Sequence, residues 1–173
     1  DFNMKLCKTT QEAIKNVSSI NQSIIFKTGE SRLNTISAEK NILASIAIDE
    51  TFPVDCAIYD LNSFLGAINL FDDPELTFND TNVIISEGNN NCVFYYTDPS
   101  IVISPPEKDI KLPSLDVEFN LKEESIYTLL KASSVLGVED IVIKGGDGKI
   151  VMQAADIKTS GSNSFTIELG EYS

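Results

Sequence analysis

The sequence contains no histidine. This absence excludes Ser-His and Cys-His nucleophile pairs, imidazole metal ligands and the most common general base of enzymes. Catalysis would have to rely on carboxylates or lysines, and the sequence shows no coherent cluster of them. We therefore predict a protein that is not an enzyme and that has no metal site or cofactor.

Cysteine and long apolar runs are also scarce. Cys7, Cys56 and Cys92 are widely spaced and form no CxxC pair, which argues against a disulfide framework or a thiolate metal site. We expect them to act as small buried apolar residues in a reducing compartment. No run approaches the roughly 18–20 apolar residues of a spanning helix, and the first twenty residues lack a signal-peptide apolar block. These features predict a cytoplasmic protein with no membrane partner.

Positive charge is in short supply. The chain has 26 acidic and 13 basic residues, which gives a formal net charge of −13. This balance by itself predicts poor affinity for nucleic acid, because phosphate binding requires local positive potential. Only the charge that faces a ligand matters, however, so the positions of the few lysines are decisive.

What the chain does contain is an internal repeat. Residues 24–33 fall onto residues 141–150, so that Gly29 meets Gly146. Such self-similarity indicates that one supersecondary unit is used more than once. With 173 residues, 42% of them hydrophobic, the chain can bury one good core or two modest ones.

The first unit is predicted to have the order β-α-β-β-β. Helical spacing of apolar residues predicts a helix over residues 9–21, with Thr9 or Thr10 as its N-cap. The sequence Gly29-Glu30-Ser31 predicts a hairpin turn between the two strands that flank it. The predicted strands cover residues 4–6, 23–28, 32–36 and 43–48.

The same plan recurs twice along the chain. The second unit is predicted to have Asp60 as the N-cap of a helix that ends near Phe71. Its predicted strands cover residues 55–59, 75–78, 83–86 and 92–97. The third unit is predicted to have a helix over residues 123–136 and strands over 117–121, 141–144, 149–154 and 164–169. The buried stripe expected on the third helix is Ile126, Leu129, Leu130, Ser133 and Leu136.

A counterpart of segment 55–97 is missing after the third unit. If β-α-β-β-β units combine in pairs, two pairs require four units, and the sequence shows three. We therefore expect the natural protein to be longer than this chain.

Residues 97–115 differ in kind from the rest. Pro99, Pro105, Pro106 and Pro113 remove backbone donors and fix φ, so the segment is predicted to be an extended connector between two domains. The run Ile101-Val102-Ile103 could add to a sheet as an edge strand.

Three motifs have competing interpretations. The run Asp72-Asp73-x-Glu75 could bind a hard cation, but no motif context supports ligation and a solvated loop is favoured. The run Phe94-Tyr95-Tyr96 could stack on bases, but neighbouring strand residues point to opposite faces, which favours ordinary packing. The run 145–148 joins two strands and has no following helix, so it predicts a hairpin turn and not a phosphate-binding loop.

Lys8, Lys15 and Lys131 are the informative charges. Lys8 and Lys15 point away from the apolar stripe of the first helix, and Lys131 aligns with Lys15. A solvated helix face is the simple explanation, since Glu12 is available at i+4 from Lys8. The repeated outward lysine, in a chain with twice as many acids as bases, indicates instead a face that meets a polyanion.

Several segments resemble a known family. The opening residues 4–8, the helix residues 14–17 and above all Val54-Asp55-Cys56-Ala57-Ile58-Tyr59-Asp60-Leu61-Asn62-Ser63-Phe64-Leu65-Gly66 resemble the sliding clamps of T-even-like bacteriophages, which are DNA polymerase processivity factors. Residues 97–102 and 129–131 also fit, and the resemblance runs over essentially the whole chain from Met4. It leaves the origin of residues 1–3 open, because they precede the methionine at which family chains begin.

The resemblance implies an α+β fold of DNA-clamp domains, built from repeated β-α-β-β-β units with helices on one face of antiparallel sheets. It implies a first clamp domain over residues 1–98, a connector over 99–115, and the first half of a second domain over 116–173. It also implies a head-to-tail homotrimeric ring around duplex DNA, with helices lining the hole.

The resemblance further implies a non-catalytic role in DNA replication, in which the clamp tethers the replicative polymerase for processive synthesis. Its implied partners are duplex DNA, without sequence preference, the DNA polymerase and a clamp loader, in the cytoplasm of an infected bacterium. The implied lumen residues are Lys15 and Lys131, and less strongly Lys5, Lys8 and Lys122. An apolar pocket for partner peptides is implied only regionally, around Ile101, Val102 and Ile103. The alternative is a stand-alone acidic interaction module that does not encircle DNA.

Overall fold

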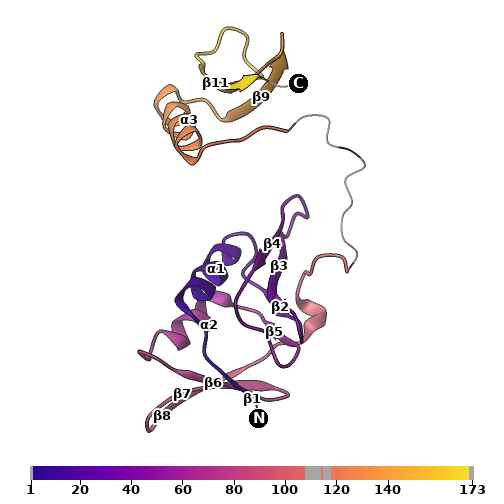
Figure 1. Cartoon of the computed structure of the whole chain (residues 1–173), viewed down its shortest axis with the longest axis vertical. Helices are drawn as coiled ribbons and strands as arrows, with labels where there is room; N and C mark the ends of the chain where they lie inside the picture. Colours follow the sequence, from indigo (N-terminus) through magenta and orange to yellow (C-terminus); the bar gives the residue numbers. More distant parts are fainter. Residues whose placement is uncertain (1, 108–113, 115–117, 172–173) are drawn as a thin grey trace. The chain divides into compact units, whose positions relative to one another are not determined.

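The computed structural model of the chain describes residues 2–107, 114 and 118–171. It divides into two compact units, Asp1–Asp109 (unit 1) and Ile110–Ser173 (unit 2), and each is described by itself (Figure 1). The domain limits expected from the sequence, 98 and 115, stay a prediction, and much of the expected connector lies outside the described residues.

Unit 1 follows the predicted order of elements closely. In chain order it comprises β1 (Phe2–Met4), α1 (Lys8–Ser18), β2 (Ile24–Phe26), β3 (Arg32–Ile36), β4 (Leu43–Ala47), β5 (Cys56–Ile58), α2 (Leu61–Ile68), β6 (Glu75–Phe78), β7 (Asn82–Glu87), β8 (Asn90–Tyr95) and the 3-10 turn η1 (Pro99–Ile101). Two β-α-β-β-β units are therefore present in unit 1.

Helix α1 begins earlier than predicted. Its N-cap is Cys7, whose Sγ accepts a hydrogen bond from the Thr10 backbone N–H at 3.4 Å. The prediction of Thr9 or Thr10 as N-cap is wrong, because the Thr10 side chain is buried inside the first turn. Sulfur is a weak acceptor, so preferences for oxygen-bearing caps do not point to Cys7.

Helix α2 confirms the predicted N-cap. Asp60 Oδ1 accepts the backbone N–H groups of Asn62 and Ser63 at 3.0 and 3.1 Å. The helix ends at Ile68, before the predicted end near Phe71, with Asn69 as its C-cap.

The strands of unit 1 form three separate sheets. The order is β1-β6-β7-β8 in the largest, while β2 pairs with β5 and β3 pairs with β4, all antiparallel. The predicted hairpin between β2 and β3 is wrong, although Lys27 O and Glu30 N do close a turn at 3.2 Å. Thr28 and Gly29 hydrogen-bond to Asp55 and Phe52, and these contacts direct β2 towards β5.

Residues before Met4 belong to the fold. Phe2 and Asn3 pair with Phe78 and Thr77 of β6, and Thr77 Oγ1 donates to Asn3 Oδ1 at 2.9 Å. The predicted strand over residues 4–6 is therefore shifted towards the N-terminus, and Leu6 is instead a buried core residue between β1 and α1.

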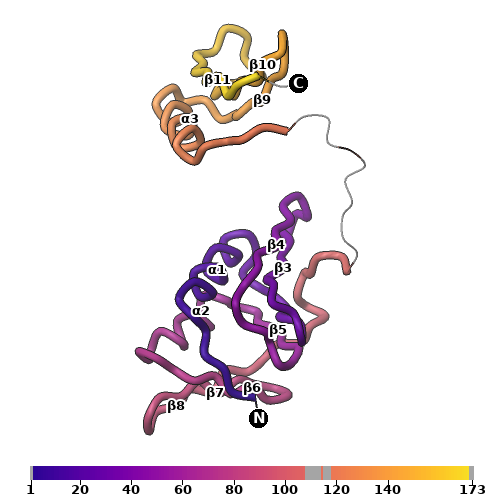
Figure 2. The backbone as a smooth tube through the Cα atoms, viewed as in Figure 1, coloured from indigo at the N-terminus to yellow at the C-terminus, as the bar shows by residue number. Residues whose placement is uncertain are grey.

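The two helices of unit 1 lie side by side and share one core with the strands (Figure 2). Ser18 Oγ of α1 lies 3.4 Å from Asn62 Oδ1 of α2. Aromatic rings fill the centre, where Phe26 stacks on Phe52 at a centroid distance of 4.2 Å and Phe64 meets Phe94 edge-on at 5.4 Å. This packing favours one fixed placement of the helices on the strands.

Unit 2 has one helix and three strands among its described residues. They are α3 (Glu123–Leu136), β9 (Asp140–Gly146), β10 (Lys149–Ala155) and β11 (Phe165–Glu171), with sheet order β11-β10-β9. Asp147 and Gly148 have φ values of 51° and 76°, which fit the two-residue hairpin predicted between β9 and β10. The predicted strand over 117–121 is wrong for residues 118–121, because Leu121 packs on the core of unit 2 without strand pairing.

The buried stripe predicted on α3 is partly wrong. Leu129 is fully buried and Leu136 packs against the same core, but Ile126 and Leu130 are exposed. The physical reason is that α3 packs mainly on β10 and β11, which leaves its other apolar side uncovered. Within the described ranges, no helix is long and apolar enough to span a bilayer.

Candidate nucleic-acid interface

The outward face of the helical layer in unit 1 carries little acid. Lys8, Glu12 and Lys15 of α1 are exposed or partly exposed, and α2 has no charged residue. The exposed residues of α2 and its C-cap are polar or small, namely Asn62, Ser63, Gly66 and Asn69, with Leu70 following. In a chain of net charge −13, α1 carries two exposed lysines and one exposed glutamate on this face.

The N-terminus of α1 is already neutralised by a carboxylate of the same unit. Glu50 accepts the Cys7 backbone N–H through Oε1 at 2.5 Å and the Thr10 hydroxyl through Oε2. Partial burial alone would raise the pKa of Glu50, but the hydrogen bonds from Thr10 and Cys7 outweigh it and lower that pKa below its ordinary value. A bound anion would therefore meet the lysines of α1 and not its helix end.

Lys5 is the least available of the predicted lumen lysines. Its Nζ forms an ion pair with Asp73 Oδ2, and that hydrogen bond raises the pKa of Lys5. The charge of Lys5 is thus largely compensated within unit 1.

The helix of unit 2 presents a mixed face. Lys131 is exposed on α3, as predicted, and Lys122 is the N-cap residue with no side-chain capping bond. Glu123 and Glu124 occupy the first turn of α3. Their negative charges interact favourably with the helix dipole and reduce the local positive charge of Lys122. Lys15 and Lys131 belong to separate units, and each is placed only within its own unit.

The predicted partner-peptide region does not form an edge strand. Ile101 ends the 3-10 turn η1, which Asp98 caps by accepting the Ser100 N–H at 2.8 Å. The alternative of an edge strand over residues 101–103 is wrong, because Pro99 and this cap turn the chain before any ladder begins. Val102 is buried, whereas Ile101 and Ile103 are exposed.

One asparagine ties this region to β3. Asn21 Nδ2 donates to Ile36 O at 3.0 Å and to Ile103 O at 3.3 Å. Exposed Leu43 lies directly across from Ile36 in the β3–β4 ladder. Exposed Ile103 and exposed Leu43 are therefore both linked to β3, although they come from segments far apart in sequence.

The remaining motifs behave as structural elements. Glu87 accepts the backbone N–H groups of Asp72 and Asp73, the latter at 2.7 Å, as in an ordinary hydrogen-bonded loop. Phe94 packs on the core while Tyr95 is exposed, which confirms the packing interpretation of that run. Among residues 2–107, 114 and 118–171, no three Cys, Asp or Glu side chains gather closely enough to hold a metal ion.

The cysteines do not share one environment. Cys56 is buried, and desolvation raises the pKa of its thiol to about 12. Cys92 is half-buried against the core, whereas Cys7 is exposed at the start of α1. The expectation of burial is therefore wrong for Cys7, since a capping position lies at the helix end.

A family model described as "DNA polymerase processivity factor" matches residues 5–102, which is more than half of the chain. The chain belongs to the DNA polymerase processivity factor family. The matched range includes residues 54–66, the segment on which the resemblance to phage clamps chiefly rested.

Three relatives of this chain are sliding clamps of bacteriophages. It is 37% identical over 174 aligned positions to the sliding clamp of Vibrio phage KVP40, with 97% of this chain and 78% of that protein covered. It is 32% identical to the sliding clamp of Enterobacteria phage T4, with 98% and 75% covered. The sliding clamp of Escherichia phage RB69 is 34% identical, with 86% and 65% covered.

Solved structures show the same fold at low identity. PCNA from Thermococcus kodakaraensis superposes with a TM-score of 0.63 at 15% identity, covering 98% of this chain and 73% of that one. Proliferating Cellular Nuclear Antigen from Entamoeba histolytica gives 0.60 at 16% identity, covering 96% and 74%. The predicted α+β clamp fold is confirmed.

Sequence patterns missed two residues of this processivity factor that organise the candidate sites, Glu50 and Asn21. Glu50 reaches Cys7 and Asn21 reaches Ile103, and both contacts join residues distant in sequence. No local periodicity or motif could have identified them.

Proposed function

We propose that this chain is a subunit of a sliding clamp that encircles duplex DNA and tethers the replicative polymerase, without catalysis of its own. The observation that carries the proposal is the helical face of unit 1, which presents Lys8 and Lys15 among mostly uncharged polar residues in an otherwise acidic chain. Membership of the processivity factor family supplies the biological context.

The chemistry of that face suits sliding. Lys8 and Lys15 would neutralise phosphates at long range, while Asn62 and Asn69 offer hydrogen bonds that are independent of sequence. Binding of this kind holds the protein near the duplex but lets it move along the axis.

Ring closure would use the free edges of the sheets. In the described part of the chain, β8 and β11 are edge strands, and exposed Val93 and Tyr95 lie on β8. An edge of one subunit can extend a sheet of the next, which generates a head-to-tail ring when the rotation closes. A homotrimer opened by a clamp loader in the cytoplasm of an infected bacterium is the assembly that we propose.

Partner peptides are proposed to bind around Ile101, Val102 and Ile103. Exposed Ile101 and Ile103 flank the buried Val102, and Leu43 lies near the carbonyl groups that Asn21 joins. An apolar anchor of a polymerase tail could bury itself on this surface.

The test is charge reversal at the outward lysines in the complete protein. Lys15→Glu combined with Lys131→Glu should lower polymerase processivity at least about tenfold at physiological salt, because phosphate contacts become repulsive. Lys158→Glu, in the exposed loop after β10, is the matched control and should have little effect. Unchanged processivity in the double variant would refute the lysine assignment.

Assembly provides an independent test of the ring. The complete protein should be retained on circular duplex DNA and released when the DNA is linearised. A monomer at all concentrations with no retention on circles would favour an acidic interaction module over a clamp.

A further inference from the structure

One face of the β3–β4 hairpin packs on the core of unit 1, and the other face points away from it. Leu33 and Thr35 of β3 are 1% and 2% exposed, so the residues that alternate with them lie on the outward face. Arg32 and Asn34 are two of these outward residues. Arg32 is exposed and is the only arginine of the chain.

A series of side-chain hydrogen bonds orients Arg32 on this face. Arg32 Nε donates to Ser45 Oγ at 2.9 Å, and Ser45 Oγ donates to Asn34 Oδ1 at 2.6 Å. Asn34 lies directly across from Ser45 in the ladder, and its Nδ2 donates to Glu30 Oε2 at 3.3 Å. Residues of both strands therefore fix the guanidinium through Nε, which leaves the N–H groups of its two Nη atoms for a ligand.

Arg32 forms no ion pair within residues 2–107, 114 and 118–171, where the ion pairs all involve lysines. The carboxylate of Glu30, the acidic member of the hydrogen-bonded series, is bound by Asn34 and not by the guanidinium. Arginine presents its outer N–H groups as a rigid fork that matches the two oxygens of a carboxylate. An oriented arginine without such a partner, in a chain with 26 acidic residues, therefore indicates a carboxylate ligand from another molecule.

An apolar area lies at the opposite end of the same face. Leu43 is 45% exposed and lies across from Ile36 in the ladder. Asn21 Nδ2 joins the carbonyl oxygens of Ile36 and Ile103, and Ile103 is 41% exposed. Arg32 and Ile36 are four residues apart on β3, which corresponds to about 13 Å along a strand.

From these contacts we propose that the outward face of the β3–β4 hairpin binds an acidic segment of the polymerase tail in an extended conformation. An apolar side chain of the tail lies on Leu43 and Ile103, and a carboxylate about four residues away pairs with Arg32. This inference rests on the proposed function, because it adds the chemistry of the partner to the peptide site proposed around residues 101–103.

Charge complementarity sets the register of the tail. The net charge of −13 disfavours a carboxylate over most of the surface, so the pair with Arg32 distinguishes one position of the tail from its neighbours. The apolar contact alone would hold the tail at one point and leave its direction open. Two contacts of different chemistry, at the two ends of the face, select an acidic tail in one direction.

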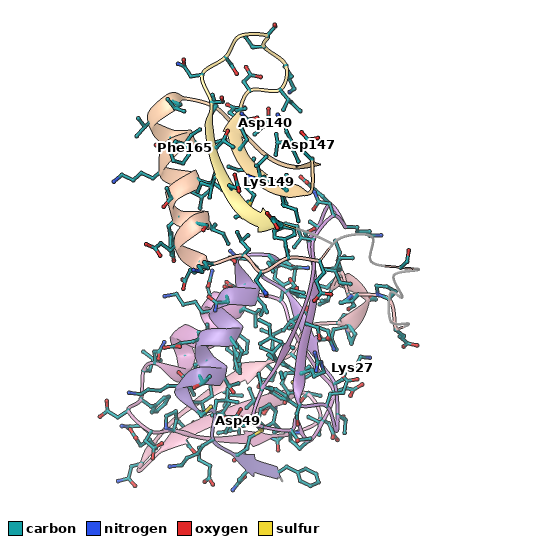
Figure 3. All side chains as sticks on the ribbon, turned by 45° about the horizontal axis from the view of Figure 1, so that its top comes forward. Lys27, Asp49, Asp140, Asp147, Lys149 and Phe165 are labelled. Carbon is teal, nitrogen blue, oxygen red and sulfur yellow. The ribbon has the colours of Figure 1, made fainter. Side chains whose placement is uncertain are left out.

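The test measures the affinity of the complete protein for a fluorescently labelled synthetic peptide of the C-terminal tail of the cognate polymerase. Arg32→Ala should raise the Kd about tenfold, because the two-pronged pair is lost. Arg32→Lys keeps the charge without the fork and should give an intermediate Kd. Lys27→Ala is the matched control and should bind like wild type. Lys27 is exposed (Figure 3), and its Nζ lies 3.9 Å from Oδ2 of Asp55, just before β5.

Two further variants separate the parts of the site. Leu43→Ser removes apolar contact area and should also raise the Kd about tenfold. Ser45→Ala removes the acceptor of Arg32 Nε and should raise the Kd less than Arg32→Ala, because the charge remains but is no longer oriented. Arg32 and Ser45 are exposed, so their variants should melt like wild type. A change in affinity without a change in stability separates a ligand contact from a structural role.

The source of the carboxylate is identified with two modified peptides. If amidation of the C-terminus abolishes the effect of Arg32→Ala, Arg32 binds the terminal carboxylate. If replacement of the acidic residues of the tail by their amides abolishes it instead, Arg32 binds an acidic side chain. Either result supports the inference.

Three results would overturn the inference. Equal affinity of Arg32→Ala and wild type for the peptide would do so and leave the proposed peptide site intact. Weaker retention of Arg32→Ala on circular DNA, with unchanged peptide affinity, would assign Arg32 to a phosphate contact. If the wild-type protein does not bind the tail, the proposed peptide site and this inference both fail.

Discussion

At the scale of single residues, Glu50 and Cys7 determine how the lysine-bearing helix α1 begins. Glu50 comes from the segment after β4 and accepts two hydrogen bonds at the start of α1. Thr10 is buried and depends on that carboxylate for its hydroxyl partner. The position of Lys8, one residue after the cap, follows from this arrangement.

Glu50→Gln should destabilise unit 1 by about 1–2 kcal/mol at pH 7, because the amide cannot accept both hydrogen bonds. The pKa of Glu50 is lower in the folded state than in the unfolded state. The ionised carboxylate therefore stabilises the fold at pH values above its unfolded pKa, and this stabilisation is lost as the pH falls through its folded pKa. Thermal unfolding measured from pH 7 to pH 3 should therefore show that the difference in stability between Glu50→Gln and the wild type becomes smaller in acid. Glu39→Gln, at an exposed carboxylate in the β3–β4 turn, is the control, and an equal loss there would contradict this role for Glu50.

Cys7→Ser should leave unit 1 as stable or slightly more stable. The serine hydroxyl is a stronger acceptor for the Thr10 N–H than the thiol, and serine is a favoured N-cap. Cys92→Ser, beside the core, is the comparison and should be destabilising. Thermal melts of the two variants give the measurement, and a larger loss for Cys7→Ser would show that the thiol itself is needed.

At the scale of elements, α1 and α3 share a plan but differ in what covers them. Helix α1 buries Ile14 and Val17 because α2 lies beside it. Helix α3 buries Leu129 on β10 and β11, while Leu130 on its other side is exposed. Periodicity identified both apolar sides of α3, but not which of them has a neighbour.

Adjacent leucines on α3 should therefore differ sharply in their cost of truncation. Leu129→Ala should destabilise unit 2 by about 2–4 kcal/mol through lost contacts and a cavity, whereas Leu130→Ala should cost less than about 1 kcal/mol in dilute solution. Denaturant unfolding at low protein concentration makes the comparison. Equal losses would mean that the Leu130 side is covered in the folded monomer.

At the scale of the whole molecule, the distribution of negative charge and the free edge strands both bear on the proposed ring. The excess of acid is compatible with DNA binding if it lies away from the helical face of unit 1, where Lys8 and Lys15 stand. Free edges at β8 and β11 provide surfaces for joining copies without using that face. A ring built in this way would confine DNA topologically, so tight phosphate binding would be unnecessary.

Tyr95→Lys on β8 should weaken ring assembly of the complete protein by about tenfold or more, because it places charge at the contact that we propose between subunits. Tyr59→Lys, at a similarly exposed tyrosine just before α2, is the matched control. Mass measurement across a concentration series, with folding checked by circular dichroism, reports the outcome. If both variants assemble like the wild type, β8 is not part of the ring contact.

The sequence by itself determined the elements and the surface charge. Spacing of apolar residues located α1, α2 and α3, Asp60 marked the start of α2, and the repeat identified a unit used more than once. Outward lysines followed from helical geometry, since the side chains opposite a buried stripe must face solvent. These properties depend on local interactions, which neighbouring residues fix.

Only the tertiary structure decided which elements meet. The sequence could not show that β2 pairs with β5, that Glu50 neutralises the start of α1, or that Asn21 holds Ile103. It could not show that Leu129 is buried while Leu130 is exposed. Each of these outcomes depends on contacts between distant segments, and the free energy of such contacts is set by shape and packing that no local pattern contains.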